Sequence, residues 1–182
     1  MRILAVAAAT SLLVFGANTE QHREIEKRYP TQPSQRIEIN GFTGSEITFR
    51  SWDKNEVYIK VDVSISSSDN DFERKYIESV AITDEQSPQT LAVTFRESER
   101  WRRGRDSFWG IVRSIFSGSY LRKEISGEIY VPRSNAVVTD MKYGSIALEN
   151  MKGPLRLLGQ GNTLKLKNCS AVLEIENNYG TT

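Results

Sequence analysis

Apolar and polar residues alternate along most of the chain from residue 36 onward. The longest alternating run places apolar residues at every second position from Val57 to Ile65, and shorter runs cover residues 37–39, 47–49, 91–95 and 125–131. Such period-two patterning, interrupted by glycine and polar turn residues, is typical of β-strands with one buried face. The pattern therefore predicts a mostly β protein.

Two segments have helical spacing instead. Apolar residues lie three or four positions apart between Phe72 and Val80, which predicts a short helix with Asp69 or Asp71 as its N-cap. The same acidic run could offer oxygen ligands to calcium, but it lacks the further acids and closing glutamate of an EF-hand loop. Residues 108–116 repeat apolar side chains at amphipathic-helix spacing and predict a second short helix.

The C-terminal part of the chain repeats with a period of eighteen residues. The six matched pairs are Ile146/Leu164, Leu148/Leu166, Asn150/Asn168, Gly153/Ala171, Leu155/Leu173 and Leu157/Ile175. Each unit predicts two short strands and a turn, so stacked units would place like residues above like and let the turn asparagines hydrogen-bond in a ladder. We therefore predict a right-handed β-solenoid or β-roll-like stack of about 18-residue repeats, with one or two short helices.

The ends of such a stack need caps, and the 108–116 helix is a candidate cap, with a membrane-binding helix as the alternative. The sequence stops soon after the Tyr179-Gly180 pair, which repeats Tyr143-Gly144, so we expect a shortened member of a longer architecture. Cys169 takes the place of Met151 in the repeat and is expected to fill the core.

The N-terminus has the features of a secretory signal peptide. Arg2 precedes an apolar run over residues 3–14 that is shorter than the roughly 20 residues needed to span a bilayer. Gly16 and Ala17 offer cleavage sites, and an uncleaved anchor is the alternative. We expect a signal peptide at 1–16, a polar lead-in arm at 17–35 and one domain at 36–182, with no transmembrane segment after cleavage.

Composition argues against most enzyme classes. Lys plus Arg is 24 and Asp plus Glu is 23, so the overall charge gives no attraction to nucleic acid. One cysteine excludes an internal disulfide framework, and one histidine, His22, argues against a triad or a histidine-based metal site. No glycine-rich phosphate loop or Gly-x-Ser-x-Gly elbow occurs. We expect no cofactor, no metal and no catalysis.

A basic and aromatic block between residues 97 and 120 is the predicted binding site. Its candidate contacts are Arg100, Trp101, Arg102, Arg103, Arg105 and Trp109. These residue types bind anionic lipid, lipopolysaccharide or acidic glycan by charge and stacking. The alternative is a solvated loop that pairs with its own acidic neighbours, Glu97, Glu99 and Asp106.

Outward carboxylates in the repeats offer an enzymatic alternative. Asp140, Glu149, Glu174 and Glu176 could serve a polysaccharide-cleaving β-helix. The competing interpretation is that these side chains only make the outer surface soluble, like Lys165 and Lys167.

The stretch from Gly44 to Val61, which contains Trp-Asp-Lys-Asn-Glu-Val, resembles a family of bacterial envelope proteins known as the putative adhesin family. Ile129-Tyr130-Val131-Pro132 and the repeated Tyr-Gly turns add to the resemblance, which covers residues 36–182. It implies an exported, non-catalytic β protein of predicted solenoid form. The 97–120 insertion and the early C-terminus depart from the family pattern.

These observations lead to one functional expectation and two alternatives. We expect an exported binding or scaffold protein of the bacterial cell envelope, located in the periplasm, on the cell surface or secreted. Its partner would be an envelope glycan, an anionic lipid or a protein. The alternatives are a periplasmic structural or sensing component and a carbohydrate-active β-helix enzyme.

Overall fold

The computed structural model describes residues 10–14, 21–97, 121–170 and 173–181. The strands there are β1 (Thr10–Val14), β2 (Gln21–Pro30), β3 (Arg36–Thr43), β4 (Glu46–Trp52), β5 (Glu56–Ser67), β6 (Ala81–Gln86), β7 (Thr90–Arg96), β8 (Leu121–Pro132), β9 (Val137–Lys142), β10 (Ser145–Glu149), β11 (Leu155–Gln160), β12 (Thr163–Lys167) and β13 (Leu173–Asn178). One helix, α1 (Asn70–Ser79), lies between β5 and β6. The mostly β prediction is therefore confirmed for the described residues.

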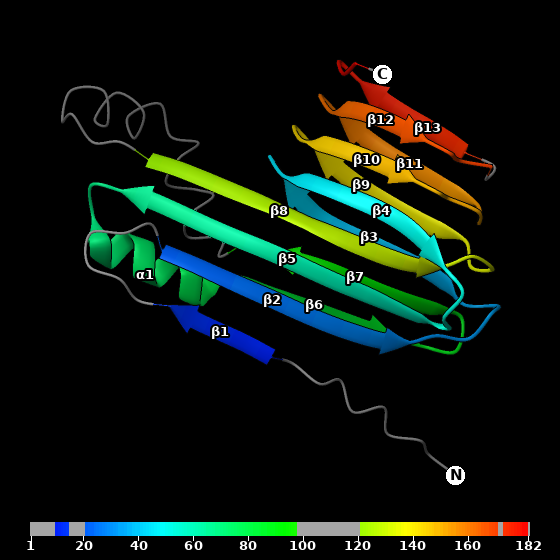
Figure 1. Cartoon of the computed structure of the whole chain (residues 1–182), viewed down its shortest axis with the longest axis horizontal. Helices are drawn as coiled ribbons and strands as arrows, with labels where there is room; N and C mark the ends of the chain where they lie inside the picture. The colour runs from blue at the N-terminus through cyan, green and yellow to red at the C-terminus, as the bar shows by residue number, and fades with distance from the viewer. Residues whose placement is uncertain (1–9, 15–20, 98–120, 171–172, 182) are drawn as a thin grey trace, which may run out of the picture.

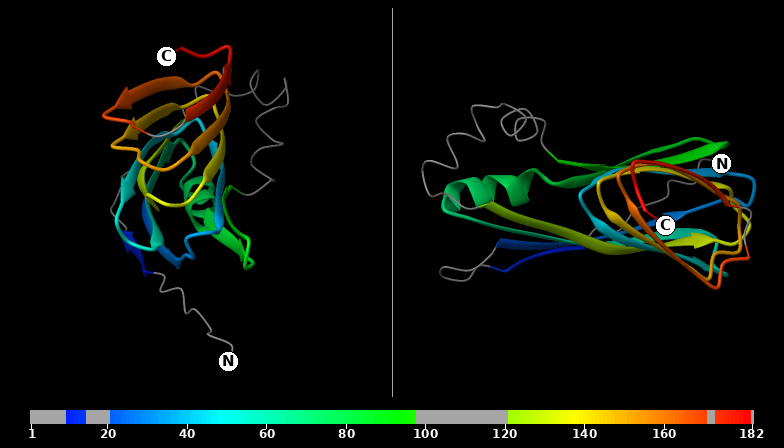
Figure 2. Two further views of the ribbon diagram at one scale, coloured as in Figure 1. Left: turned by 90° about the vertical axis from the view of Figure 1, so that its right-hand side faces the viewer. Right: turned by 90° about the horizontal axis from the view of Figure 1, so that it is seen from above.

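The strands form two sheets that lie one behind the other (Figures 1 and 2). Sheet A has the order β1-β2-β5-β8-β4-β10-β12, and sheet B has the order β13-β11-β9-β3-β7-β6. Along β5, every second residue from Val57 to Ile65 is buried and the residues between them are partly exposed. The alternating residues therefore point one apolar face of each sheet into a shared core and leave the other face in water.

The predicted β-solenoid is wrong, because both sheets are mixed and their strand order is not that of a coil. In sheet A, β5 pairs antiparallel with both β2 and β8, and in sheet B, β6 pairs antiparallel with β7. β4 and β5 follow one another in the chain and lie in the same sheet. They are not neighbours there, because β8 inserts between them. The eighteen-residue period describes local pairing in the C-terminal part and does not extend to the N-terminal strands.

Within the repeated part, the period does set the register. β10 pairs in parallel with β12, so that Ile146 lies beside Leu164, and β11 pairs in parallel with β9 and β13. Asn150 and Asn168 both have positive φ angles, of 55° and 53°. Asparagine tolerates this left-handed conformation better than most residues, which explains why it recurs at these turns. The described residues show no hydrogen bond between the Asn150 and Asn168 side chains, so the expected ladder is not needed to explain the recurrence.

The predicted helix near residue 72 is confirmed as α1. The Asp69 carboxylate caps it by accepting hydrogen bonds from the backbone N–H groups of Asp71 and Phe72, at 3.0 and 3.1 Å. At the other end, the Arg23 guanidinium donates to the carbonyl oxygens of Ile77 and Val80, at 2.9 and 2.8 Å. The helix packs against β5 and β2 (Figure 1). The acidic run thus serves as a cap, as expected.

The segment expected to be a polar arm contains strand β2, which pairs antiparallel with β5. Only Ile25 and Tyr29 are buried apolar residues of this strand, and they lie four positions apart, so the alternation is too weak to recognise in the sequence. Thr10–Val14, inside the expected signal peptide, forms β1 and pairs with β2. Among the described residues, no helix has the length and apolar character needed to cross a membrane.

Candidate functional site

A row of charged and aromatic side chains crosses the outer face of sheet A. The pairing registers place Arg28 beside Tyr58, Tyr58 beside Tyr130, Tyr130 beside Arg50, and Arg50 beside Glu149. Each of these residues alternates with buried neighbours such as Val57, Ile59 and Ile129, so its side chain points outward. Five strands, β2, β5, β8, β4 and β10, thus contribute to one row.

Three aromatic rings form a cluster at this row. The Trp52 ring centroid lies 5.1 Å from that of Tyr130 and 6.0 Å from that of Tyr58, and the two tyrosine rings are 5.9 Å apart. The Trp52 indole N–H donates to the Glu56 carbonyl oxygen at 2.8 Å, which fixes the orientation of the ring. All three rings are half-buried, so part of each aromatic surface faces water. We refer to Trp52, Tyr58 and Tyr130 as the aromatic cluster.

Cationic groups lie over the aromatic cluster. The Arg28 guanidinium is 4.2 Å from the Tyr58 ring centroid, and the Lys54 ammonium is 4.6 Å from that of Trp52. Arg28 also forms an ion pair with Glu56, at 3.1 Å. These cation–π contacts stabilise the ring positions before any ligand is bound.

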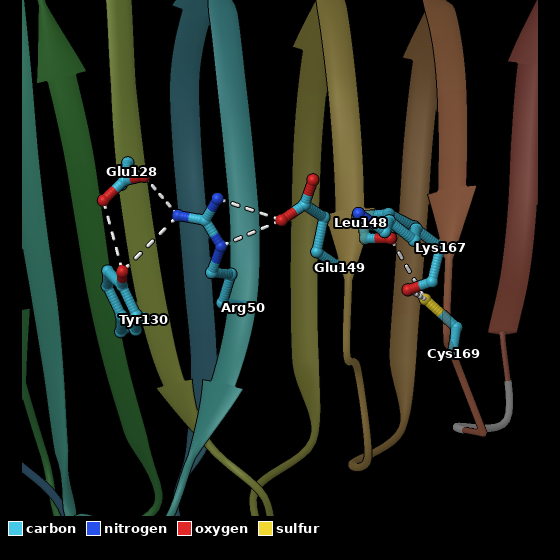
Figure 3. Close-up of polar contacts among 7 residues, drawn as sticks. All are labelled: Arg50, Glu128, Tyr130, Leu148, Glu149, Lys167 and Cys169. Atoms are coloured by element: carbon cyan, nitrogen blue, oxygen red, sulfur yellow. Dashed lines mark hydrogen bonds and ion pairs between the residues drawn. The ribbon is translucent and has the colours of Figure 1, made fainter.

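Arg50 joins the aromatic cluster to an acidic network (Figure 3). Its guanidinium forms ion pairs with Glu128 on one side and Glu149 on the other, the latter at 2.9 Å. The Tyr130 hydroxyl donates to the other carboxylate oxygen of Glu128 at 3.2 Å. The hydrogen bond from Arg50 lowers the pKa of Glu128, and the hydrogen bond to Glu128 raises the pKa of Arg50. The Arg50–Glu128 ion pair therefore stays charged at neutral pH.

A shallow, open depression of about 390 Å³ borders this network on the same face. Its charged lining residues are Glu46, Asp62, Glu128 and Lys165. The other residues that line it are mostly small: Ile47, Thr48, Ser126, Gly127, Ser145 and Ala147. Glu128 belongs to both the depression and the Arg50 network, so the depression and the aromatic cluster form one continuous surface.

This surface suits a ligand with alternating apolar and hydroxylated faces. Half-exposed rings can stack on the C–H face of a sugar, and the neighbouring carboxylates and guanidinium groups can exchange hydrogen bonds with its hydroxyls. Arg50, Arg28 and Glu128 are already in ion pairs, so they offer hydrogen bonds rather than uncompensated charge.

The predicted binding residues Arg100, Trp101, Arg102, Arg103, Arg105 and Trp109 lie outside the described residues, as does the expected 108–116 helix. That site stays a prediction. In the described part of the chain, no group of three or more histidine, cysteine, aspartate or glutamate side chains is placed to hold a metal ion.

The structure divides the candidate carboxylates between the two sheets, with Asp140 and Glu176 in one row of sheet B on either side of Leu158. Glu149 lies on sheet A and pairs with Arg50, whereas Glu174 and Glu176 lie on sheet B and both pair with Arg156, at 3.4 and 3.5 Å. Asp140 is on β9 of sheet B, and its backbone N–H donates to the Asn40 side chain at 3.1 Å.

Sequence reasoning missed the aromatic cluster. All three residues lie in the stretches that resemble the adhesin family, and nothing in those stretches singles them out as a binding site. The available signal was the occurrence of aromatic residues at the outward positions of alternating strands, where polar residues are the norm.

Comparisons with known proteins give little further information. No family model and no curated protein matches the chain, so the resemblance to the adhesin family has no matching model behind it. One solved structure that matches the chain is the crystal structure of a "putative cell adhesion protein" from Clostridium sporogenes. It is 11% identical and matches with a TM-score of 0.47, covering 88% of this chain and 97% of the other.

Proposed function

We propose that the protein is an exported, non-catalytic binding protein of the bacterial cell envelope, of the adhesin kind, and that it binds glycans on the outer face of sheet A. The observation that carries this proposal is the aromatic cluster, which is held on the solvent-facing side of a sheet beside an open polar depression. Aromatic side chains on an otherwise polar sheet face provide more apolar contact than strand pairing alone requires.

The charge of the surface favours a neutral glycan over an anionic one. Lys60 pairs with Glu24 at 2.8 Å, and Arg50 lies between two carboxylates. An anionic ligand would have to compete with these carboxylates for the same cations. A neutral sugar can instead stack on the rings while the ion pairs stay intact.

The test is binding of the purified protein to a panel of envelope-derived and synthetic glycans, measured by titration calorimetry. Trp52→Ala and Tyr130→Ala are each expected to weaken binding about five- to thirtyfold, because each removes a stacking surface worth roughly 1–2 kcal/mol. Tyr130→Phe keeps the ring and is expected to retain most of the affinity.

The matched control is Tyr143→Ala. Tyr143 is an exposed aromatic residue, but it lies in a turn outside the aromatic cluster. Thermal unfolding of every variant separates lost binding from lost folding. Unchanged affinity in folded Trp52→Ala, or an equal loss in Tyr143→Ala, would contradict the proposed site.

The envelope location has a separate test, which is protease treatment of intact cells that carry a C-terminally tagged protein. Loss of the tag without lysis is the result expected of a surface adhesin. Protection until the outer envelope is opened would place the protein in the periplasm and favour the scaffold or sensing alternative.

A further inference from the structure

The depression on sheet A lies next to the aromatic cluster along the direction of the strands. On β8, Tyr130 belongs to the aromatic cluster, and Ser126 lines the far side of the depression. At a rise of about 3.3 Å per residue, Ser126 lies roughly 13 Å from Tyr130 along the strand. A single sugar ring is smaller than this span, so a glycan that contacts both places must be an oligosaccharide.

Mostly small side chains on three adjacent strands line the depression. The register places Ser126 of β8 beside Glu46 of β4, and Glu46 beside Ser145 of β10. In the next outward row, Thr48 of β4 lies beside Ala147 of β10. The volume of about 390 Å³ is within the range of small-ligand sites, roughly 300–1,000 Å³. The depression is therefore large enough to hold part of a glycan chain.

Several polar side chains of the depression have no partner within the described residues. Glu46, Ser126 and Ser145 form no side-chain hydrogen bond or ion pair with another residue of that part of the chain. By contrast, Arg50 is already held between two carboxylates. Side chains that bind only water can exchange it for the hydroxyls of a sugar without breaking a contact of the fold.

We infer that the depression is a second subsite of the proposed glycan site, and that the ligand is a neutral oligosaccharide that runs along β8. One sugar stacks on the aromatic cluster, and a further sugar of the same chain occupies the depression. Glu128 forms the boundary between them, because its carboxylate oxygens are held by Arg50 and by the Tyr130 hydroxyl. The lining has more acidic than basic residues, which disfavours an anionic ligand. This inference rests on the proposed function and adds a minimum ligand length to it.

The test measures the affinity of the purified full chain for two neutral series by titration calorimetry. The series are oligomers of glucose and of N-acetylglucosamine, each from the single sugar to the hexamer. Affinity is expected to rise with chain length until the oligomer spans both subsites and then to level off, because a linked sugar reaches the second subsite at a high effective concentration. Equal affinity for short and long oligomers would overturn the inference, as would the absence of binding in both series.

Ala147→Ile fills the depression and leaves the aromatic cluster intact. Isoleucine suits a strand position and changes no charge. This variant is expected to weaken binding of the longest oligomer roughly tenfold and that of the shortest by less than about twofold. Ser126→Ile is an independent variant with the same expected dependence on length.

The matched control is Ala92→Ile. Ala92 has the same half-buried, outward position as Ala147, but it lies on β7 of sheet B. This variant should bind every oligomer like the wild type, and a loss equal to that of Ala147→Ile would overturn the inference. Circular dichroism melting checks that each variant is folded.

Trp52→Ala separates this inference from the proposed function, because it should weaken binding of long and short oligomers alike. If it does so while Ala147→Ile and Ser126→Ile bind long oligomers like the wild type, the second subsite is refuted and the aromatic cluster stands as the binding site. If Trp52→Ala leaves every affinity unchanged, the proposed site itself is contradicted, and the inference falls with it.

Discussion

At the scale of single residues, Arg50 is the group on which the candidate site depends. It contacts Glu128, Glu149 and Tyr130, which belong to two neighbouring strands on opposite sides of β4. Truncating Arg50 would leave two carboxylates without their shared partner and would remove the cation from beside the Tyr130 ring. The chemistry of this face is therefore set by one long side chain on a central strand.

Stability should depend on pH through Glu128. Its folded pKa is below the ordinary value of 4.5, chiefly because Arg50 donates a hydrogen bond to it, so its contribution is fully present above pH 4.5. That contribution is lost as the pH falls through the lowered pKa. Urea unfolding should show Glu128→Gln less stable than the wild type at pH 7, with the difference shrinking in acid. A difference that stays constant from neutral to acidic pH would contradict this account.

Gly41 is a position where substitution should be costly for two separate reasons. It has a φ of 91° at the irregularity where β3 shifts its register against β9, and an added Cβ would lie 2.1 Å from the Phe95 carbonyl oxygen. Gly44 also has a positive φ, of 63°, but the nearest atom to an added Cβ is 3.9 Å away.

Gly44→Ala should therefore cost about 1–2 kcal/mol, the price of the left-handed conformation alone. Gly41→Ala should cost clearly more, because the backbone of β7 must also move. Denaturant unfolding of the two variants measures both costs. Equal destabilisation would show that the contact with Phe95 is relieved without strain.

At the scale of elements, the repeat provides a matched pair of leucines. Leu148 is fully buried and Leu166 is half-exposed at the same position of adjacent strands. Leu148→Ala should destabilise the protein by about 2–5 kcal/mol through the cavity that it leaves, and Leu166→Ala by less than about half as much. Chemical unfolding of the two variants measures the difference. Similar losses for both variants would mean that Leu166 is buried in solution.

Elements with strong local patterns could be predicted from the sequence. The alternation from Val57 to Ile65 predicts β5. The helical spacing around Tyr76, with Asp69 as a possible N-cap, predicts α1. β2 could not be predicted, because its buried apolar residues are only Ile25 and Tyr29 and it pairs with the distant strand β5, from Pro30 beside Glu56 to Gln21 beside Ile65. Its existence depends on tertiary pairing rather than on local preference.

At the scale of the whole molecule, the order of strands was not accessible from the sequence. The repeat period correctly relates β9, β10, β11, β12 and β13, but it contains no information on where a strand without the repeat will insert. β8 occupies the place between β5 and β4, and the intervening chain between β5 and β8 includes a helix and two strands of the other sheet.

The candidate site escaped prediction for the same reason. Trp52, Tyr58 and Tyr130 lie on three strands, and Tyr130 reaches the other two only because β8 inserts between them. The residues next to each of them in the sequence show only a polar turn, after Trp52, or the alternation of a strand, around Tyr58 and Tyr130. The basic and aromatic block was easier to recognise because its residues are contiguous.

The most direct test of the account is to map the binding surface by NMR while a neutral glycan that binds the protein is added. The account predicts shifts of the Trp52 indole N–H and of backbone amides in β4, β5 and β8 around Tyr58 and Tyr130. Shifts confined to residues 98–120, with the outer face of sheet A unchanged, would contradict it and would favour the basic and aromatic block as the binding site.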